Sequence, residues 1–147
     1  MKYRISLFLL TLALAASSTL MAHASGCSNT TIKGSYAFTI HGTVFLPDGS
    51  TLLIDGLAKT TFDGNGNVSQ LDAVATNGYV APGWRLSTGT YSVQPNCTGT
   101  MTITNGDQPL LHVQLIVAQS GNSIHDMVMD PGFATTAEAE RITATKQ

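Results

Sequence analysis

The side chains that carry chemistry in this chain are few, and histidine and methionine form the clearest group among them. His125, Met127 and Met129 alternate along one stretch. Alternate positions lie on one face of a β-strand. Thioether side chains adapt well to apolar ligands. We therefore assign His125, Met127, Met129 and also His112 to a candidate site for a small apolar or amphipathic ligand. Pairing about the turn at 120–122 is expected to place His112 near Met129.

A second candidate region is the least regular segment, from about residue 77 to residue 87. It holds Tyr79, Pro82 and the single tryptophan, Trp84. Loops over the mouth of a barrel often form part of a binding site, and aromatic side chains supply large contact areas there. Tyr79 and Trp84 therefore join the candidate ligand-binding residues. The alternative is that Trp84 plugs one end of the barrel as part of its core.

Catalytic and metal motifs are absent from the sequence. The chain has no Gly-x-Ser-x-Gly elbow, phosphate loop, His-Glu-x-x-His pair or Cys-x-x-Cys motif. A metal site of three histidines would need a strand register that brings His41, His112 and His125 together, and the sequence does not predict such a register. Glu138 and Glu140 alternate with alanine and are expected to face solvent. The sequence therefore predicts no catalytic residue, no metal and no cofactor.

The stretch from Asp63 to Asn67, Asp-Gly-Asn-Gly-Asn, resembles the start of a calcium-binding loop. Such a loop needs a glycine at its sixth position and a glutamate at its twelfth, where this chain has Val68 and Val74. Asp-Gly and Asn-Gly also supply the positive φ angles of a tight hairpin. The hairpin explains every residue of the stretch, and it is the interpretation we adopt.

The N-terminal region predicts export. Lys2 and Arg4 precede an uncharged apolar run, and Ala22-His23-Ala24 matches a cleavage site. Residues 1–24 are therefore predicted to be a signal peptide and residues 25–147 a single domain. Two cysteines in an exported chain predict one disulfide, Cys27–Cys97. The chain is therefore predicted to be secreted or periplasmic. The alternative is a lipid anchor on Cys27.

The charge pattern limits the partners. After residue 24 the chain has five Lys and Arg against nine Asp and Glu, a net charge of −4. It has no basic patch, so nucleic acid is not expected as a partner. No stretch after the signal approaches the roughly 20 apolar residues of a membrane-spanning helix. The sequence leaves the oligomeric state open.

The elements that must position these residues are β-strands. Apolar and polar residues alternate in runs separated by Gly, Asn, Asp and Pro turns, and no helical periodicity appears after the signal. Eight strands are predicted, at about residues 34–46, 51–62, 68–76, 88–94, 97–104, 110–119, 123–129 and 134–143. Short turns favour an all-β, antiparallel up-and-down barrel, because closure removes exposed edges. A two-sheet sandwich is the alternative. The strand at 110–119 is expected to be buried on both faces.

Several motifs together support a resemblance. They are Gly34-x-Tyr36-x-Phe38, the turn Phe62 to Val68, Gly89-Thr90-Tyr91-x-Val93, Asn96-Cys97-Thr98-Gly99-Thr100 and Asp130-Pro131-Gly132. In these motifs the chain resembles a group of exported bacterial proteins of uncharacterised function. Its architecture is similar to that of lipocalin-like and allene-oxide-cyclase-like small barrels. The motifs specify strands and turns, so the resemblance implies a fold and carries over no functional residue.

Three functions fit these observations. The first is a secreted or periplasmic barrel that binds a small apolar or amphipathic molecule without catalysis, which requires an internal cavity. The second is a cyclase-type enzyme that works by positioning its substrate, which requires a His, Tyr or Glu pointing into that cavity. The third is a structural or adhesive envelope module, which requires an open strand edge.

Overall fold

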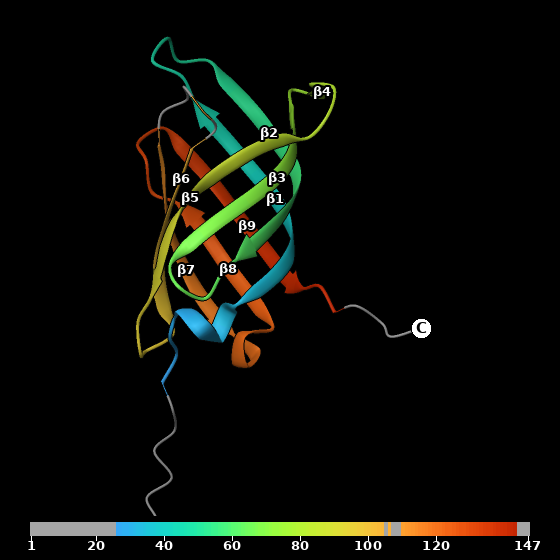
Figure 1. Cartoon of the computed structure of the whole chain (residues 1–147). Helices are drawn as coiled ribbons and strands as arrows, with labels where there is room; N and C mark the ends of the chain where they lie inside the picture. Colours follow the sequence, from blue (N-terminus) through green and yellow to red (C-terminus); the bar gives the residue numbers. More distant parts are fainter. Residues whose placement is uncertain (1–25, 105, 107–109, 144–147) are drawn as a thin grey trace, which may run out of the picture.

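The computed structural model describes residues 26–104, 106 and 110–143; the predicted signal peptide, residues 1–24, lies outside the described residues. These described residues form nine strands and two short 3-10 helices, whose arrangement is drawn in Figure 1. The helices are η1 (Asn29–Ile32) and η2 (Gln119–Gly121). The strands are β1 (Gly34–Phe45), β2 (Thr51–Phe62), β3 (Asn67–Thr76), β4 (Tyr79–Val80), β5 (Arg85–Val93), β6 (Thr98–Thr104), β7 (Leu111–Ala118), β8 (Ser123–Val128) and β9 (Phe133–Arg141).

Eight of the strands close into an antiparallel barrel. The sheet runs in the order β2-β1-β9-β8-β7-β6-β5-β3-β4, and β2 also pairs with β3, which closes the ring. The predicted barrel is therefore confirmed and the sandwich is wrong. The Asp63–Asn67 hairpin is confirmed as well, since Phe62 pairs with Val68 across it. The sequence missed β4 and the first residues of β5, because Tyr79, Pro82 and Trp84 obscure strand alternation there.

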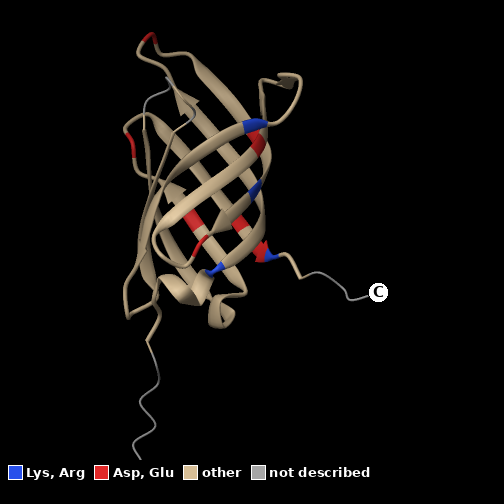
Figure 2. Ribbon diagram, viewed as in Figure 1, with Lys and Arg blue, Asp and Glu red and all other residues tan. Residues whose placement is uncertain are grey.

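Alternation along each strand separates the barrel interior from its outer surface. On β1, Tyr36 and Phe38 are buried, whereas Ala37 and Thr39 are exposed. The prediction that the strand at 110–119 is buried on both faces is wrong, because the outer face of β7 has no second layer over it. Ile116 on that face is 58% exposed. Charged residues are sparse along the strands (Figure 2).

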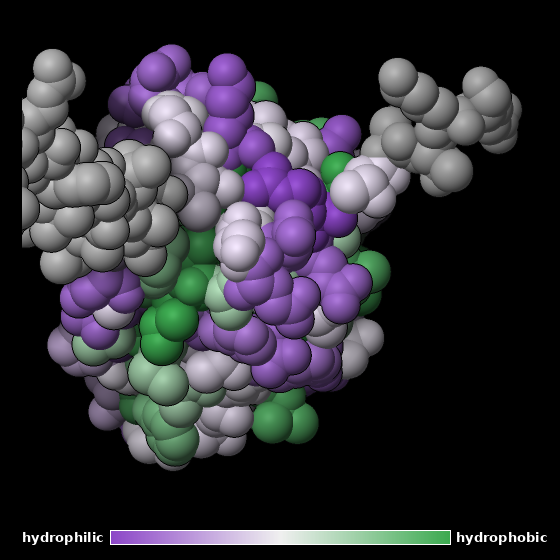
Figure 3. Space-filling view, turned by 90° about the horizontal axis from the view of Figure 1, so that it is seen from below, coloured by the Kyte–Doolittle hydropathy of each residue, from purple (hydrophilic) through white to green (hydrophobic). Residues whose placement is uncertain are grey.

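One end of the barrel is filled by aromatic rings; we call it the closed end. Phe62 packs edge-on between Tyr36 and Tyr91, with ring centroids 5.6 and 4.8 Å away. The guanidinium of Arg141 lies 4.8 Å from the centre of the Tyr36 ring. Helix η1 crosses this end and contributes the fully buried Ile32. Seen from this end, polar residues lie beside a smaller apolar patch (Figure 3).

Polar groups at the closed end are paired. The Arg141 guanidinium donates hydrogen bonds to the carbonyls of Thr31, Lys33 and Gly121. The Tyr36 hydroxyl also donates to the Gly121 carbonyl. The Tyr91 hydroxyl accepts from the Gly64 amide at 2.9 Å and donates to a carbonyl of η1. Buried polar groups cost stability unless they are hydrogen-bonded, so these bonds allow a tightly packed end.

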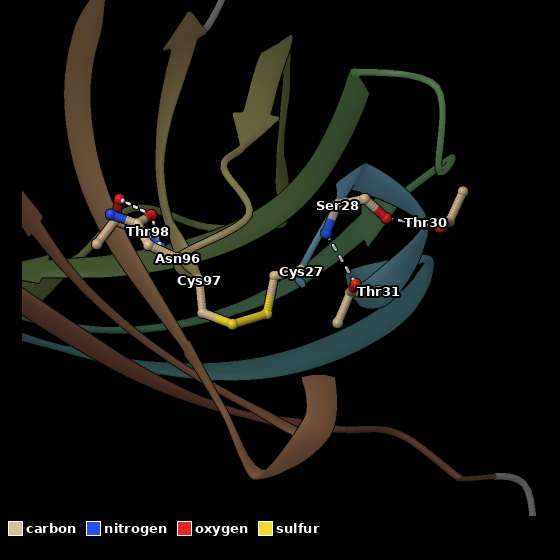
Figure 4. Close-up of a disulfide and its surroundings, with 7 residues drawn as sticks. All are labelled: Cys27, Ser28, Thr30, Thr31, Asn96, Cys97 and Thr98. Atoms are coloured by element: carbon tan, nitrogen blue, oxygen red, sulfur yellow. Dashed lines mark hydrogen bonds between the residues drawn. A yellow bond between two sulfur atoms is a disulfide. The ribbon is translucent and has the colours of Figure 1, made fainter. Parts of the chain in front are cut away.

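The predicted disulfide is present. Cys27 and Cys97 are bonded, with their Cα atoms 4.9 Å apart, and their chain separation is 70 residues (Figure 4). The bond ties the segment before η1 to the turn between β5 and β6 (Figure 4). It therefore fixes the cap of the closed end to the barrel wall.

Candidate ligand-binding cavity

A cavity of about 480 Å³ occupies the other half of the barrel. It extends toward the end that carries the loops at 46–50, 77–84 and 129–132, which we call the open end. Thirteen of its 23 lining residues are apolar, among them Phe38, Ile54, Val74, Val128 and Phe133. Concave, mostly apolar sites of 300–1,000 Å³ are typical of small-molecule binding. The volume and lining therefore suit a small organic molecule.

The cavity has a polar wall on β3 and β5, centred on Asp72. Arg85 Nε donates to one Asp72 carboxylate oxygen at 2.7 Å, and Gln70 Nε2 donates to the other at 3.1 Å. The Gln70 side chain in turn accepts from Thr60 Oγ1 at 2.8 Å. Asp72 is only 4% exposed. A carboxylate buried to this degree needs a charged partner, and Arg85 supplies it.

Asp126 lies on the opposite wall and has a different environment. Strand β8 places it between Ile124 and Val128 on the inward face, and three strands separate β8 from β3 in either direction. No hydrogen bond or ion pair joins Asp126 to another described side chain. Burial raises the pKa of the Asp126 carboxyl to about 7, with a backbone hydrogen bond at Ala137 acting weakly the other way. Desolvation disfavours the charged form of a carboxyl.

Thr135 on β9 is a second unpaired polar group in this wall. It is 6% exposed and lines the cavity, and its Oγ1 has no hydrogen-bond partner among the described residues. It pairs with Gly42 of β1. A Cβ built at residue 42 would lie nearest the Ala134 carbonyl oxygen, 2.5 Å from Thr135 Cα and 2.8 Å from Thr135 Oγ1, so glycine at 42 allows the β9 backbone to approach closely. An unsatisfied buried polar atom in a native fold calls for an explanation, such as a bound molecule.

The rim of the cavity is acidic. Asp130 follows β8 and lines the cavity, and its carboxylate accepts from the His112 backbone amide at 2.7 Å. His112 Nδ1 also lies 2.7 Å from the other carboxylate oxygen. These two hydrogen bonds lower the pKa of the Asp130 carboxyl. Asp130 is therefore ionised near neutral pH, and it places a negative charge at the rim.

The structure places the residues predicted from the sequence on the outside of the barrel. His125, Met127 and Met129 line a groove on the outer face, and Met127 and Met129 are 50% and 48% exposed. The expected neighbour is confirmed, since the Met129 amide donates to the His112 carbonyl at 2.7 Å. The four residues thus share the outer face of β7 and β8 and do not line the interior cavity. Ligand binding by them stays a prediction.

The aromatic loop also projects outward. Tyr79 and Trp84 are 70% and 62% exposed, and neither lines the cavity. The alternative in which Trp84 plugs the barrel is therefore wrong, because the closed end is filled by Tyr36, Phe62 and Tyr91 instead. A ligand-binding role for Tyr79 and Trp84 stays a prediction.

The turn that resembled a calcium loop uses its oxygens internally. Asp63 accepts hydrogen bonds from the amides of Asn65 and Asn67 at 2.7 and 3.0 Å and from the Asn67 side chain at 2.7 Å. These bonds lower the pKa of the Asp63 carboxyl. Within the described residues, no group of three or more His, Cys, Asp or Glu side chains is placed to hold a metal ion. Helices long and apolar enough to cross a bilayer are likewise absent from that part of the chain.

Sequence reasoning missed the interior polar groups Asp72, Arg85 and Asp126. The signal that reveals them is the period of two. Asp126 alternates with Ile124 and Val128, so the aspartate and its two apolar neighbours share the inward face. The chemically more conspicuous His125 and Met127 drew attention to the opposite face.

No protein-family model, curated protein sequence or solved structure significantly matches this chain. What the cavity can bind therefore follows from its own geometry and chemistry.

Proposed function

We propose that this protein binds a small amphipathic molecule in the barrel cavity and performs no chemistry on it. The observation that carries the proposal is the 480 Å³ cavity, open toward one end of a barrel whose other end is filled by packed aromatic rings. An apolar wall removes the hydrocarbon part of a ligand from water, at roughly 25 cal/mol per Å² of buried apolar surface. The few polar groups inside orient its polar end.

Two observations favour binding over the alternatives. An enzyme of the cyclase type would present a His, Tyr or Glu to its substrate, and none of the described residues that line the cavity is one of these. An adhesive module that works by strand addition needs an open edge. The eight barrel strands all pair on both sides, so edge pairing is left to the two-residue β4.

The experiment is titration of the purified domain with N-phenyl-1-naphthylamine, a neutral apolar dye whose fluorescence rises in apolar surroundings. We expect saturable binding, and competition by 1-octanol. The variant Val128→Trp fills the cavity and should weaken dye binding at least tenfold. The matched control is Met127→Trp, one residue away on the outer face, which should leave binding unchanged.

If Val128→Trp does not fold, Val74→Trp narrows the same cavity from the opposite wall. Dye binding that survives both inward substitutions, or that Met127→Trp abolishes, would contradict the proposal and move the site to the outer groove of His125, Met127 and Met129. Absence of saturable dye binding to the native protein would contradict it too.

We further propose that the protein acts in the periplasm or outside the cell. The Cys27–Cys97 disulfide supports an oxidising compartment. A sulfur held in this bond cannot also carry a lipid, which favours a free exported domain over a lipid anchor. The intact mass of protein recovered from periplasm or medium tests both points. We expect loss of residues 1–24 and of two hydrogens, whereas an added lipid mass would contradict the proposal.

A further inference from the structure

We propose that the polar end of the ligand is a protonated amine, bound deep in the cavity by the Asp126 carboxylate with Thr135 Oγ1 as a second acceptor. This inference rests on the proposed binding function. It adds the chemical class of the ligand and the residues that select it.

The charges of the cavity favour a cation. Its charged lining residues are Asp72, Asp126, Asp130 and Arg85. Asp72 and Arg85 bind each other at 2.7 Å and neutralise one another. At the rim, Asp130 is bonded to His112. Asp126 is left as the charge of the interior that no described side chain offsets, so a ligand with one positive charge balances it.

The hydrogen-bonding capacity of this wall points the same way. An ionised carboxylate only accepts hydrogen bonds, and an ammonium group has three donors and no acceptor. Asp126 pairs with Ala137, and Thr135 is the next cavity-lining residue of β9 on the inward face, so Asp126 and Thr135 lie one inward position apart on adjacent strands. One ammonium group can therefore satisfy both the carboxylate and the orphaned hydroxyl.

An anionic head group fits less well. It would find Arg85 already bonded to Asp72, and it would enter past Asp130. A neutral alcohol can hydrogen-bond to Asp126 in either protonation state, but when the carboxyl is ionised the alcohol leaves its charge unbalanced. An ammonium group, a hydroxyl and a carboxylate, which are similar in size, should therefore bind this cavity with different affinities because their charges differ.

Binding of an amine should depend on pH. Desolvation holds the pKa of Asp126 near 7, so the carboxylate that attracts the amine is scarce at pH 5 and abundant at pH 8. The residues that face inward beside Asp126 do not titrate. They are Leu115 and Val113 on β7 and Ala137 and Thr135 on β9. Across the cavity stand Asp72 and Arg85, and Asp130 with His112 stands at the rim. His125 and Glu138 lie on the outer face.

The test compares octylamine, 1-octanol and octanoate as competitors of the bound dye between about pH 5 and pH 8. We expect octylamine to displace the dye at a concentration at least tenfold below that of octanol at pH 8. Below pH 7 the advantage should shrink by up to tenfold per pH unit, as the carboxylate is protonated. Octanol should show little pH dependence, and octanoate should be the weakest competitor at pH 8.

Asp126→Asn keeps the shape of the side chain and removes its charge. It should abolish the advantage of octylamine while octanol still competes. Glu138→Gln on the outer face of β9 is the matched control and should leave the advantage intact. If Asp126→Asn does not fold, the carboxyl carbon resonance of Asp126 in the native protein replaces it, because bound octylamine should lower the apparent pKa of that group.

The outcomes separate the two proposals. Equal competition by octylamine and octanol at every pH, or strongest competition by octanoate, overturns the amine assignment and leaves the binding cavity standing. An advantage of octylamine that persists in Asp126→Asn also overturns it. A native protein that does not bind the dye at all removes the binding function itself.

Discussion

The two ends of this barrel are built from the same strands but differ in how completely their side chains are packed and hydrogen-bonded. At the closed end, Tyr36, Phe62 and Tyr91 pack ring against ring, and Arg141 is bonded to carbonyls on two helices. At the open end, apolar residues line the 480 Å³ cavity, and Asp126 and Thr135 have no side-chain partners among the described residues. The difference indicates a division of labour, with stability at one end and binding at the other.

The largest effect should come from removing an aromatic ring at the closed end, and the same change at the open end gives the comparison. Phe62→Ala deletes a side chain that is 1% exposed between two aromatic rings. We expect it to lower the free energy of unfolding by about 3–5 kcal/mol. Phe133→Ala, at the half-buried mouth of the cavity, should cost only about 1–2 kcal/mol, because its side chain already borders empty space. Urea unfolding of both variants measures the contrast, and equal losses would contradict the division of labour.

The next effect concerns the Cys27–Cys97 disulfide at the closed end. A disulfide that closes a loop of 70 residues should stabilise the fold by up to about 4 kcal/mol, by restricting the unfolded chain. The double substitution Cys27→Ser with Cys97→Ser should therefore lower the thermal midpoint strongly. Dye binding at a temperature where the variant is still folded should be unchanged, since the bond lies far from the cavity. Loss of binding in the folded variant would show that the two ends are coupled.

Substituting Asp126 should raise the free energy of unfolding, whereas the substitutions above lower it. Its pKa is raised from 3.8 to about 7 in the folded protein, so the folded state binds more protons between these values and stability falls as pH rises through that window. Above pH 7 the group costs roughly 2–4 kcal/mol, and near pH 4 almost nothing. Asp126→Asn should accordingly be more stable than the native protein at pH 8, with the gain shrinking toward pH 4. Unfolding midpoints at several pH values test this, and a gain that does not vary with pH would argue against a desolvated carboxyl with a raised pKa.

Much of the fold was predictable because period-two alternation and turn residues carry local information. The strand from Thr51 to Phe62 and the Asp63–Asn67 hairpin are predicted with the boundaries that the structure has. The burial of β7 was mispredicted because Ile116 is apolar yet faces outward, and a single-layered barrel tolerates such exposure. The alternative in which Trp84 plugs the barrel fails because that residue is 62% exposed.

The site was harder to predict because it depends on residues brought together by closure. Asp72 and Asp126 are 54 positions apart. They differ in charge pairing because Arg85, the charged partner of Asp72, is supplied across a strand pair. Alternation alone places each aspartate inside. Only the barrel shows that one is neutralised and the other is not.

The division of labour is tested most directly by methyl-resolved NMR of the isoleucine, valine and methionine side chains during titration with octylamine at pH 8. The account predicts that resonances of Ile40, Val74 and Val128 shift with ligand, because these side chains line the cavity. Those of Val68 at the closed end and Met127 on the outer face should stay in place. Shifts confined to Met127, Met129 and Ile116, with the cavity methyl groups unmoved, would contradict it.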